Sequence, residues 1–185
     1  MTGRILASTA AFGLAFLLVF MPIRAQSISS SAWELHQTHN ASSPMSKAFA
    51  VVQNKNNFVV LSVGWNEDKQ EYIIGLHSQH LIDRSKDIRF NIDNRDSITF
   101  KGSRNWTQRE FSISNRGKSA IIGSPYSQDA KSLRQRKRTL IEWLQSGRRA
   151  VVRYDEIVYG SRTVRFTLKD SRDTISSLTG KASKE

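Results

Sequence analysis

The chain contains no cysteine, and this absence excludes several kinds of chemistry at once. Disulfide bonds, which stabilise many small exported domains, cannot form. A thiol nucleophile, a cysteine-ligated metal site and lipoprotein attachment through an N-terminal cysteine are excluded as well. The fold must therefore be stabilised by apolar burial. The roughly 160 residues that follow the first 25 are enough to form one hydrophobic core.

Acidic residues are few relative to basic ones. The sequence has 28 Lys and Arg against 16 Asp and Glu, a formal net charge of +12. Such a charge concerns partners and solubility rather than fold. For an exported protein, the anionic partners to consider are lipid headgroups, cell-wall or surface polysaccharides and extracellular nucleic acid. A solvated basic surface without a dedicated ligand is the alternative.

Catalytic motifs are also missing. The chain has no G-x-S-x-G nucleophile elbow and no Gly-rich phosphate loop. Two His-x-x-His spacings, His36/His39 and His77/His80, suggest a metal site, but they lie in or beside expected strands, where an odd offset sends side chains to opposite faces. No Cys or acidic ligand completes either pair, so ordinary polar histidines are favoured unless the two pairs meet across strands.

One acidic pair, Asp93 and Asp96, could be taken for catalytic carboxylates or a cation site. Both flank a two-residue turn, where Asp is common because it bonds its own backbone. We therefore interpret the pair as turn chemistry, and we expect no cofactor and no metal. An envelope-directed hydrolase remains the alternative function, since catalytic sets can assemble from distant parts of a chain.

The N-terminus has the pattern of a secretory signal. Met1–Arg4 is positively charged, Leu6–Phe20 is almost entirely apolar, and Pro22 and the small Ala25 follow. A membrane-spanning helix needs about 20 apolar residues, so this run is short for a permanent anchor. We predict a signal peptide at 1–25, no transmembrane segment after its cleavage, and a periplasmic or secreted, surface-associated protein.

After a leader expected to be flexible, 26–31, the chain consists mostly of short runs rich in β-branched and aromatic residues. The clearest pair flanks Asn66–Lys69, whose residues favour a hairpin turn. A bulge or break is expected in the longest run, Arg104–Ser114, because Trp106 and Phe111 would point to opposite faces of a continuous strand. The strand candidates are Trp33–Gln37, Ala48–Gln53, Phe58–Val63, Glu71–Leu76, Ile88–Ile92, Ile98–Phe100 and Arg104–Ser114.

One segment has helical periodicity. Over 129–146, apolar residues recur every three or four positions, as in an amphipathic helix. Ser127 is the expected N-terminal cap and Gly147 the expected left-handed C-terminal cap. Lys137 falls within the apolar stripe, so we expect its stem at the core edge and its ammonium group in water. The stripe comprises Ala130, Leu133, Lys137, Leu140 and Leu144.

The C-terminal part alternates most regularly. Two strands are expected to meet at the turn Tyr159–Ser161, with apolar side chains inside and basic ones outside, followed by a short helix capped by Asp170 and Asp173 that ends near Gly180. The inward residues are Ala150, Val152, Tyr154, Val164, Phe166 and Leu168.

Together these elements predict a mainly β fold: an antiparallel β-sandwich or small barrel with one amphipathic helix at about 129–146 and a short C-terminal helix. Residues 32–180 would form a single β-rich domain and 181–185 a tail.

The order of elements resembles the invasion-associated locus B family of bacterial exported proteins, over roughly residues 32–179. The resemblance lies in Trp33, the strand pair 58–76, Ile88–Asp93, the helix end Leu140–Gly147, and Val164–Lys169 before a short helix. Asp170 stands where the family has a glycine, and the cysteines common in the family are absent. The resemblance implies a periplasmic or surface-associated domain of a Gram-negative bacterium, linked to host-cell interaction, with no established catalytic site.

The basic clusters are the strongest functional signal. Fork-shaped guanidinium groups suit phosphate and carboxylate partners, although charges on outer strands also suppress edge-to-edge pairing. Nucleic acid is the weaker partner, because exposed aromatics rarely interleave with the cations and the chain carries an export signal. We predict an exported, non-catalytic binding protein whose basic patch engages an anionic envelope component or a protein. The patch comprises Arg134, Arg138, Arg149, Arg153, Arg165 and Lys169.

Overall fold

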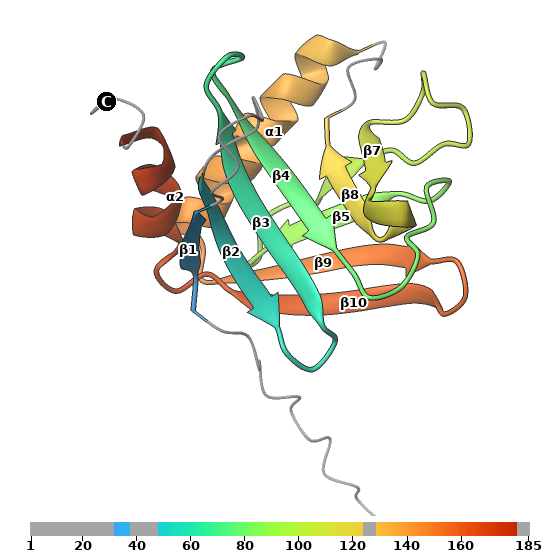
Figure 1. The fold of residues 1–185 in the computed structure, drawn as a ribbon, viewed down its shortest axis with the longest axis horizontal. Coiled ribbons are helices and arrows are strands. Elements are labelled where there is room, and N and C mark those ends of the chain that lie inside the picture. Colours follow the sequence, from blue (N-terminus) through green and yellow to red (C-terminus); the bar gives the residue numbers. More distant parts are fainter. Residues whose placement is uncertain (1–31, 38–47, 124–128, 181–185) are drawn as a thin grey trace, which may run out of the picture.

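The computed structural model describes residues 32–37, 48–123 and 129–180 (Figure 1). The predicted signal peptide, leader and tail lie outside these residues, as do His39 and the expected helix cap Ser127.

The described part of the chain forms two antiparallel sheets and two α-helices, so the predicted mainly β, sandwich-like fold is confirmed. The larger sheet has the strand order β1-β2-β3-β4-β8-β7 and the smaller sheet the order β10-β9-β5-β6; within the described ranges they do not join into a closed barrel. The strands of the larger sheet are β1 (Glu34–Gln37), β2 (Ala48–Asn54), β3 (Val59–Asn66), β4 (Glu71–His77), β7 (Phe111–Ser114) and β8 (Ser119–Ile122).

The remaining elements complete the sandwich. The 3-10 turn η1 (Asn115–Gly117) connects β7 to β8. The strands of the smaller sheet are β5 (Ile88–Ile92), β6 (Ile98–Phe100), β9 (Arg149–Glu156) and β10 (Gly160–Thr167), and the helices are α1 (Ala130–Ser146) and α2 (Ser171–Gly180).

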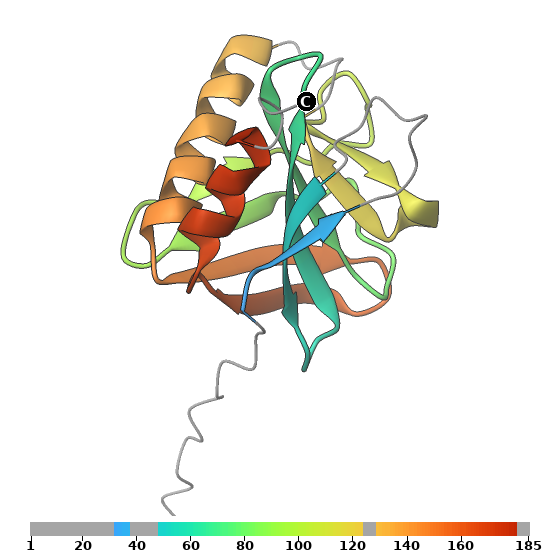
Figure 2. The same cartoon turned by 60° about the vertical axis from the view of Figure 1, so that its left-hand side comes forward.

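The two sheets cross steeply, and the helices pack along one side of them (Figures 1 and 2). Buried side chains from both sheets and both helices form a single cluster, with Phe90, Phe100 and Phe166 fully buried. The sheets are tied at one edge, where the Trp33 indole donates to the Thr167 carbonyl at 3.0 Å. On the outer face of the smaller sheet, Arg149 and Arg153 of β9 and Arg165 of β10 are exposed to solvent.

Alternation of side chains fixes the faces of β9 and β10. Ala150, Val152 and Tyr154 are buried, as are Val164 and Phe166 on the partner strand, so the predicted inward set is confirmed. Because successive side chains of a strand point to opposite faces, the residues between them face outward.

Two local expectations were wrong, and a third was right only in part. The N-terminal cap of α1 is Asp129 rather than the expected Ser127, because the Asp129 carboxylate accepts a hydrogen bond from the Ser132 amide at 3.1 Å. Gly147 has φ −87°, outside the left-handed region; a Cβ there would come within 2.5 Å of the Ile92 Cγ2 atom, so close packing explains the glycine. Of the expected strand 104–114, only Phe111–Ser114 forms a strand, and residues 106–108 form a turn, so the expected break between Trp106 and Phe111 is confirmed.

Candidate binding surface

The outer face of the smaller sheet carries a group of exposed arginines. Arg149 and Arg153 on β9 and Arg165 on β10 alternate with buried apolar residues, and all three are exposed. Lys169, exposed and of the same parity, follows β10. Four of the six residues of the predicted patch therefore lie along one hairpin.

The register sets how these arginines neighbour one another. Arg165 pairs with Val151, so it lies diagonally between Arg149 and Arg153 on the adjacent strand. Diagonal neighbours in a sheet are about 7–8 Å apart, within reach of long side chains. Their guanidinium groups can therefore contact one multivalent anion together.

The structure adds a residue that the sequence prediction missed. Arg89 on β5 is exposed and pairs directly with Arg153 on β9. The alternation of Ile88, Phe90 and Ile92 already places Arg89 on the wet face, but the pairing of β5 with β9 cannot be inferred from local patterns. We call Arg89, Arg149, Arg153 and Arg165 the arginine face.

Carboxylates provide little compensation there. Within the described residues, none forms an ion pair with Arg149, Arg153 or Arg165, and Arg89 lies 3.8 Å from the Asp87 carboxylate. Asp93 instead accepts the backbone N–H groups of Arg148 and Arg149, at 3.0 and 2.9 Å, and so fixes the start of β9. The arginine face is thus open to an external anion.

The other two predicted patch residues lie elsewhere. Arg134 and Arg138 are exposed on α1 and line a cleft of about 960 Å³ between α1 and the β3–β4 hairpin. The early turns of α1 lie at one end of the molecule and β9–β10 at the other in both ribbon views (Figures 1 and 2). The predicted patch is therefore two separate surfaces.

The cleft combines aromatic and cationic side chains. Trp65 and Tyr72 meet edge to face with ring centroids 4.9 Å apart. Lys137, expected to reach water, is instead buried, and its Nζ lies 3.3 Å from a carboxylate oxygen of Glu71. Burial lowers the pKa of Lys137, although Glu71 opposes part of this effect. The expectation failed because the β3–β4 hairpin covers this part of the helix.

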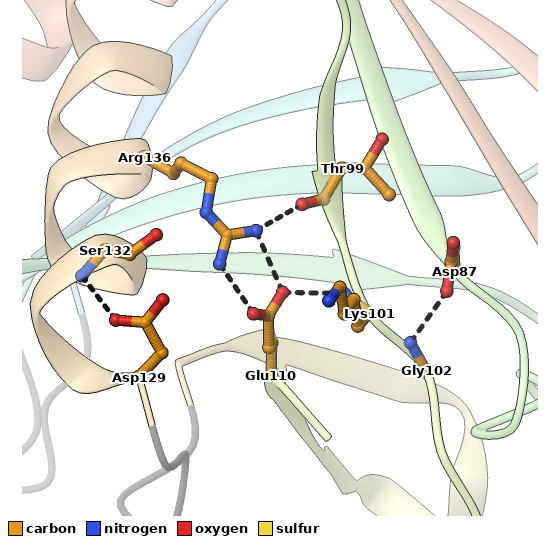
Figure 3. A network of polar contacts seen from close by, with 8 residues as sticks. All are labelled: Asp87, Thr99, Lys101, Gly102, Glu110, Asp129, Ser132 and Arg136. Carbon is orange, nitrogen blue, oxygen red and sulfur yellow. Dashed lines mark hydrogen bonds and ion pairs between the residues drawn. The ribbon is translucent and has the colours of Figure 1, made fainter. Parts of the chain in front are cut away.

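Arg136 fixes α1 against the smaller sheet (Figure 3). Its guanidinium donates to both oxygens of the buried Glu110, at 2.6 and 2.9 Å, and to the Thr99 carbonyl at 2.6 Å. The Lys101 amide also donates to Glu110 at 2.8 Å. Burial alone would raise the pKa of Glu110, but these hydrogen bonds hold it below its ordinary value. These contacts leave Arg136 engaged in structure rather than in the binding surface.

The three histidines within the described residues have separate surroundings. His36 is exposed beside Glu34 at 3.3 Å, His80 lies against the Tyr159 ring at 4.4 Å, and His77 lies on β4. No group of three or more potential metal ligands occurs among the described residues.

His77 forms a hydrogen-bonded row across the larger sheet. Its Nε2 lies 2.9 Å from the Ser62 hydroxyl and its Nδ1 lies 2.8 Å from the Ser119 hydroxyl. Gly75 makes room for this row, since a Cβ there would come within 2.6 Å of the Ser62 hydroxyl. Burial lowers the pKa of His77, so the imidazole stays neutral at neutral pH. The Ser62 hydroxyl and the His77 imidazole are thus arranged like a nucleophile and its general base. The neutral Ser119 hydroxyl, rather than a carboxylate, orients the imidazole ring.

Comparisons of the chain with protein-family models, curated proteins and solved structures find no match. Within the described ranges, neither helix has the length and apolar character needed to cross a membrane.

Proposed function

We propose that this chain is an exported, non-catalytic binding protein of the bacterial envelope that engages an anionic partner through the arginine face. The observation that supports the proposal is the convergence of Arg89, Arg149, Arg153 and Arg165 on one solvent-facing sheet surface. Long cationic side chains on a rigid sheet present guanidinium forks to phosphate or carboxylate groups at a low ordering cost.

The proposal includes a periplasmic or surface location and membership of the invasion-associated locus B family. The signal-like N-terminus supports the location. The backbone at Asp170 supports the family resemblance, since its φ of 64° lies in the left-handed region where the family's glycine would be unstrained.

The test is binding of the chain without residues 1–25 to two kinds of anionic probe. Vesicles containing phosphatidylglycerol and a soluble acidic polysaccharide are the probes, and phosphatidylcholine vesicles are the neutral control. We expect association with at least one anionic probe that weakens steeply with salt, because exposed charges are screened within about 8 Å at physiological ionic strength. Absence of binding to both anionic probes contradicts the proposal.

A hydrolase is the second candidate, and the 2.9 Å contact between Ser62 and His77 is the observation that favours it. The test is labelling by a fluorophosphonate probe, with Ser62→Ala as the control. Labelling that requires Ser62 supports the hydrolase. Against it, Ser62 is only 7% exposed and lies in the interior of a paired strand, which restricts access of a substrate carbonyl to its hydroxyl.

A further inference from the structure

The connection between β9 and β10 presents a cluster of apolar side chains to solvent. Ile157, Val158 and Tyr159 are consecutive and 62%, 75% and 59% exposed. Leu81, 40% exposed, lies beside them, because its carbonyl accepts the Ile157 amide at 2.9 Å. We call these four residues the hairpin tip. Exposed apolar residues scattered singly are ordinary, whereas a contiguous group marks a site of contact.

The tip is supported from within. Glu156, at the end of β9, is buried, and its Oε1 accepts from the Ser78 hydroxyl at 2.8 Å and the Tyr154 hydroxyl at 3.0 Å. A bridge between Ile82 and Glu156 holds the neighbouring loop against the strand. A tip already ordered in the free protein loses little conformational freedom on binding.

Cations surround the tip. Arg116 and Lys118 are exposed on either side of Gly117, whose carbonyl accepts the Ile82 amide at 2.9 Å. The exposed Arg84 follows the same loop, and Arg162 lies at the base of the hairpin, 3.5 Å from Glu156. The nearby carboxylates of Asp83 and Asp155 are half-buried. Positive charge therefore dominates this end of the molecule.

An apolar tip ringed by cations matches the chemistry of an anionic bilayer. Aliphatic side chains enter the boundary between headgroups and acyl chains, and tyrosine is favoured at that depth because its ring is apolar and its hydroxyl is polar. Basic side chains near the surface are attracted to anionic headgroups. A soluble polyanion would use the cations but would leave Ile157 and Val158 in water.

We propose that the hairpin tip inserts into the interfacial layer of an anionic lipid membrane while the flanking cations contact its headgroups. The inference rests on the proposed function and narrows its partner to a lipid surface.

The absence of cysteine allows a direct test. Val158→Cys, labelled with an environment-sensitive fluorophore, gives a single reporter at the tip, and Ser176→Cys on the exposed side of α2 gives the control. With vesicles of phosphatidylglycerol and phosphatidylethanolamine, we expect a blue shift and increased emission from the label at 158 and none at 176. The same titration with a soluble acidic polysaccharide should leave both labels unchanged.

A second variant measures the contribution of the tip. Val158→Ser with Tyr159→Ser changes exposed side chains only, so the fold should be retained. Its partition onto the anionic vesicles should fall by roughly tenfold or more, because withdrawal of large apolar side chains from water contributes at that order. Its binding to the soluble polysaccharide should not change.

The outcomes separate this inference from the proposed function. Vesicle binding with an unshifted label at 158 and an unaffected Ser variant overturns insertion and leaves the arginine face standing. Binding to the polysaccharide but not to vesicles does the same. A label that shifts with protein concentration in the absence of lipid shows a second copy on the tip, which also overturns the inference. Binding to neither probe refutes the proposed function itself.

Discussion

Arg153 on β9 lies directly opposite Arg89 on β5, so two exposed guanidinium side chains extend from paired positions of neighbouring strands. Like charges directly opposite each other destabilise an antiparallel pair. Asp87, 3.8 Å from Arg89, offsets part of this repulsion. The sheet therefore retains an unfavourable arrangement at the place where an anion would relieve it.

Replacing Arg153 should stabilise the free protein. Arg153→Gln is expected to raise the free energy of unfolding by about 0.2–1 kcal/mol at low salt, because it removes the repulsion from Arg89. The gain should shrink as salt is added. Urea titrations at two salt concentrations measure it, with Lys131→Gln on α1 as the control. A loss of stability in Arg153→Gln would show that Arg153 has a structural partner.

Glu110 should make stability depend on acid. Because hydrogen bonds from Arg136 and Lys101 hold its folded pKa below the unfolded one, its contribution is present above the unfolded pKa and is lost as pH falls through the folded pKa. Glu110→Gln should cost about 2 kcal/mol at neutral pH, since it leaves Arg136 without its charged partner. The difference from the wild type should narrow in acid. Glu67→Gln, at an exposed turn, is the control.

Lys137 should make stability rise with pH as Glu110 does, but in the alkaline window of an amine rather than in acid. Its folded pKa is lowered by burial, so the folded state binds fewer protons than the unfolded state between the lowered and the ordinary pKa, and stability rises with pH in that window. Lys137→Met should abolish this rise. It should change stability at neutral pH by less than about 1 kcal/mol, because Glu71 is partly exposed and stays solvated. Thermal unfolding of the wild type and of Lys137→Met, measured from neutral pH upward, gives the comparison. If the stability of both proteins changes with pH in the same way, the rise does not come from Lys137.

Asp170 is strained in a way that a glycine would relieve. Its φ of 64° lies in the left-handed region immediately before α2. Asp170→Gly should raise the free energy of unfolding by roughly 0.5 kcal/mol, the relief of backbone strain exceeding the added freedom of the unfolded chain. Chemical denaturation measures the change, and Asp173→Gly, within the first turn of the helix, should destabilise instead.

The elements that were predictable from sequence are those with strong local periodicity. The alternation of Ala150, Val152 and Tyr154 identified the buried face of β9, and the repeat over 129–146 identified α1. Both patterns depend only on side-chain direction within one element. The β3–β4 hairpin was also predictable, because a short polar turn joins two apolar runs.

The parts that could not be predicted depend on contacts between distant residues. The pairing of Arg89 with Arg153 joins strands 64 positions apart. The burial of Lys137 depends on where the β3–β4 hairpin crosses α1, and the glycine at 147 depends on Ile92. For the same reason the sequence prediction placed Arg134 and Arg138 in one basic patch with the hairpin arginines. Residues that are close in the sequence need not be close on the surface.

The most direct measurement of the central claim is binding of a triple variant, Arg149→Gln, Arg153→Gln and Arg165→Gln, to anionic vesicles. The matched control removes three exposed lysines from other surfaces: Lys69→Gln, Lys86→Gln and Lys131→Gln. Each basic residue near an anionic surface contributes about 1 kcal/mol, so the arginine variant should bind roughly a hundredfold more weakly while the lysine variant binds nearly as the wild type does. Equal losses in both variants, or no loss in either, would contradict the account, because binding would then follow net charge or a surface other than the arginine face.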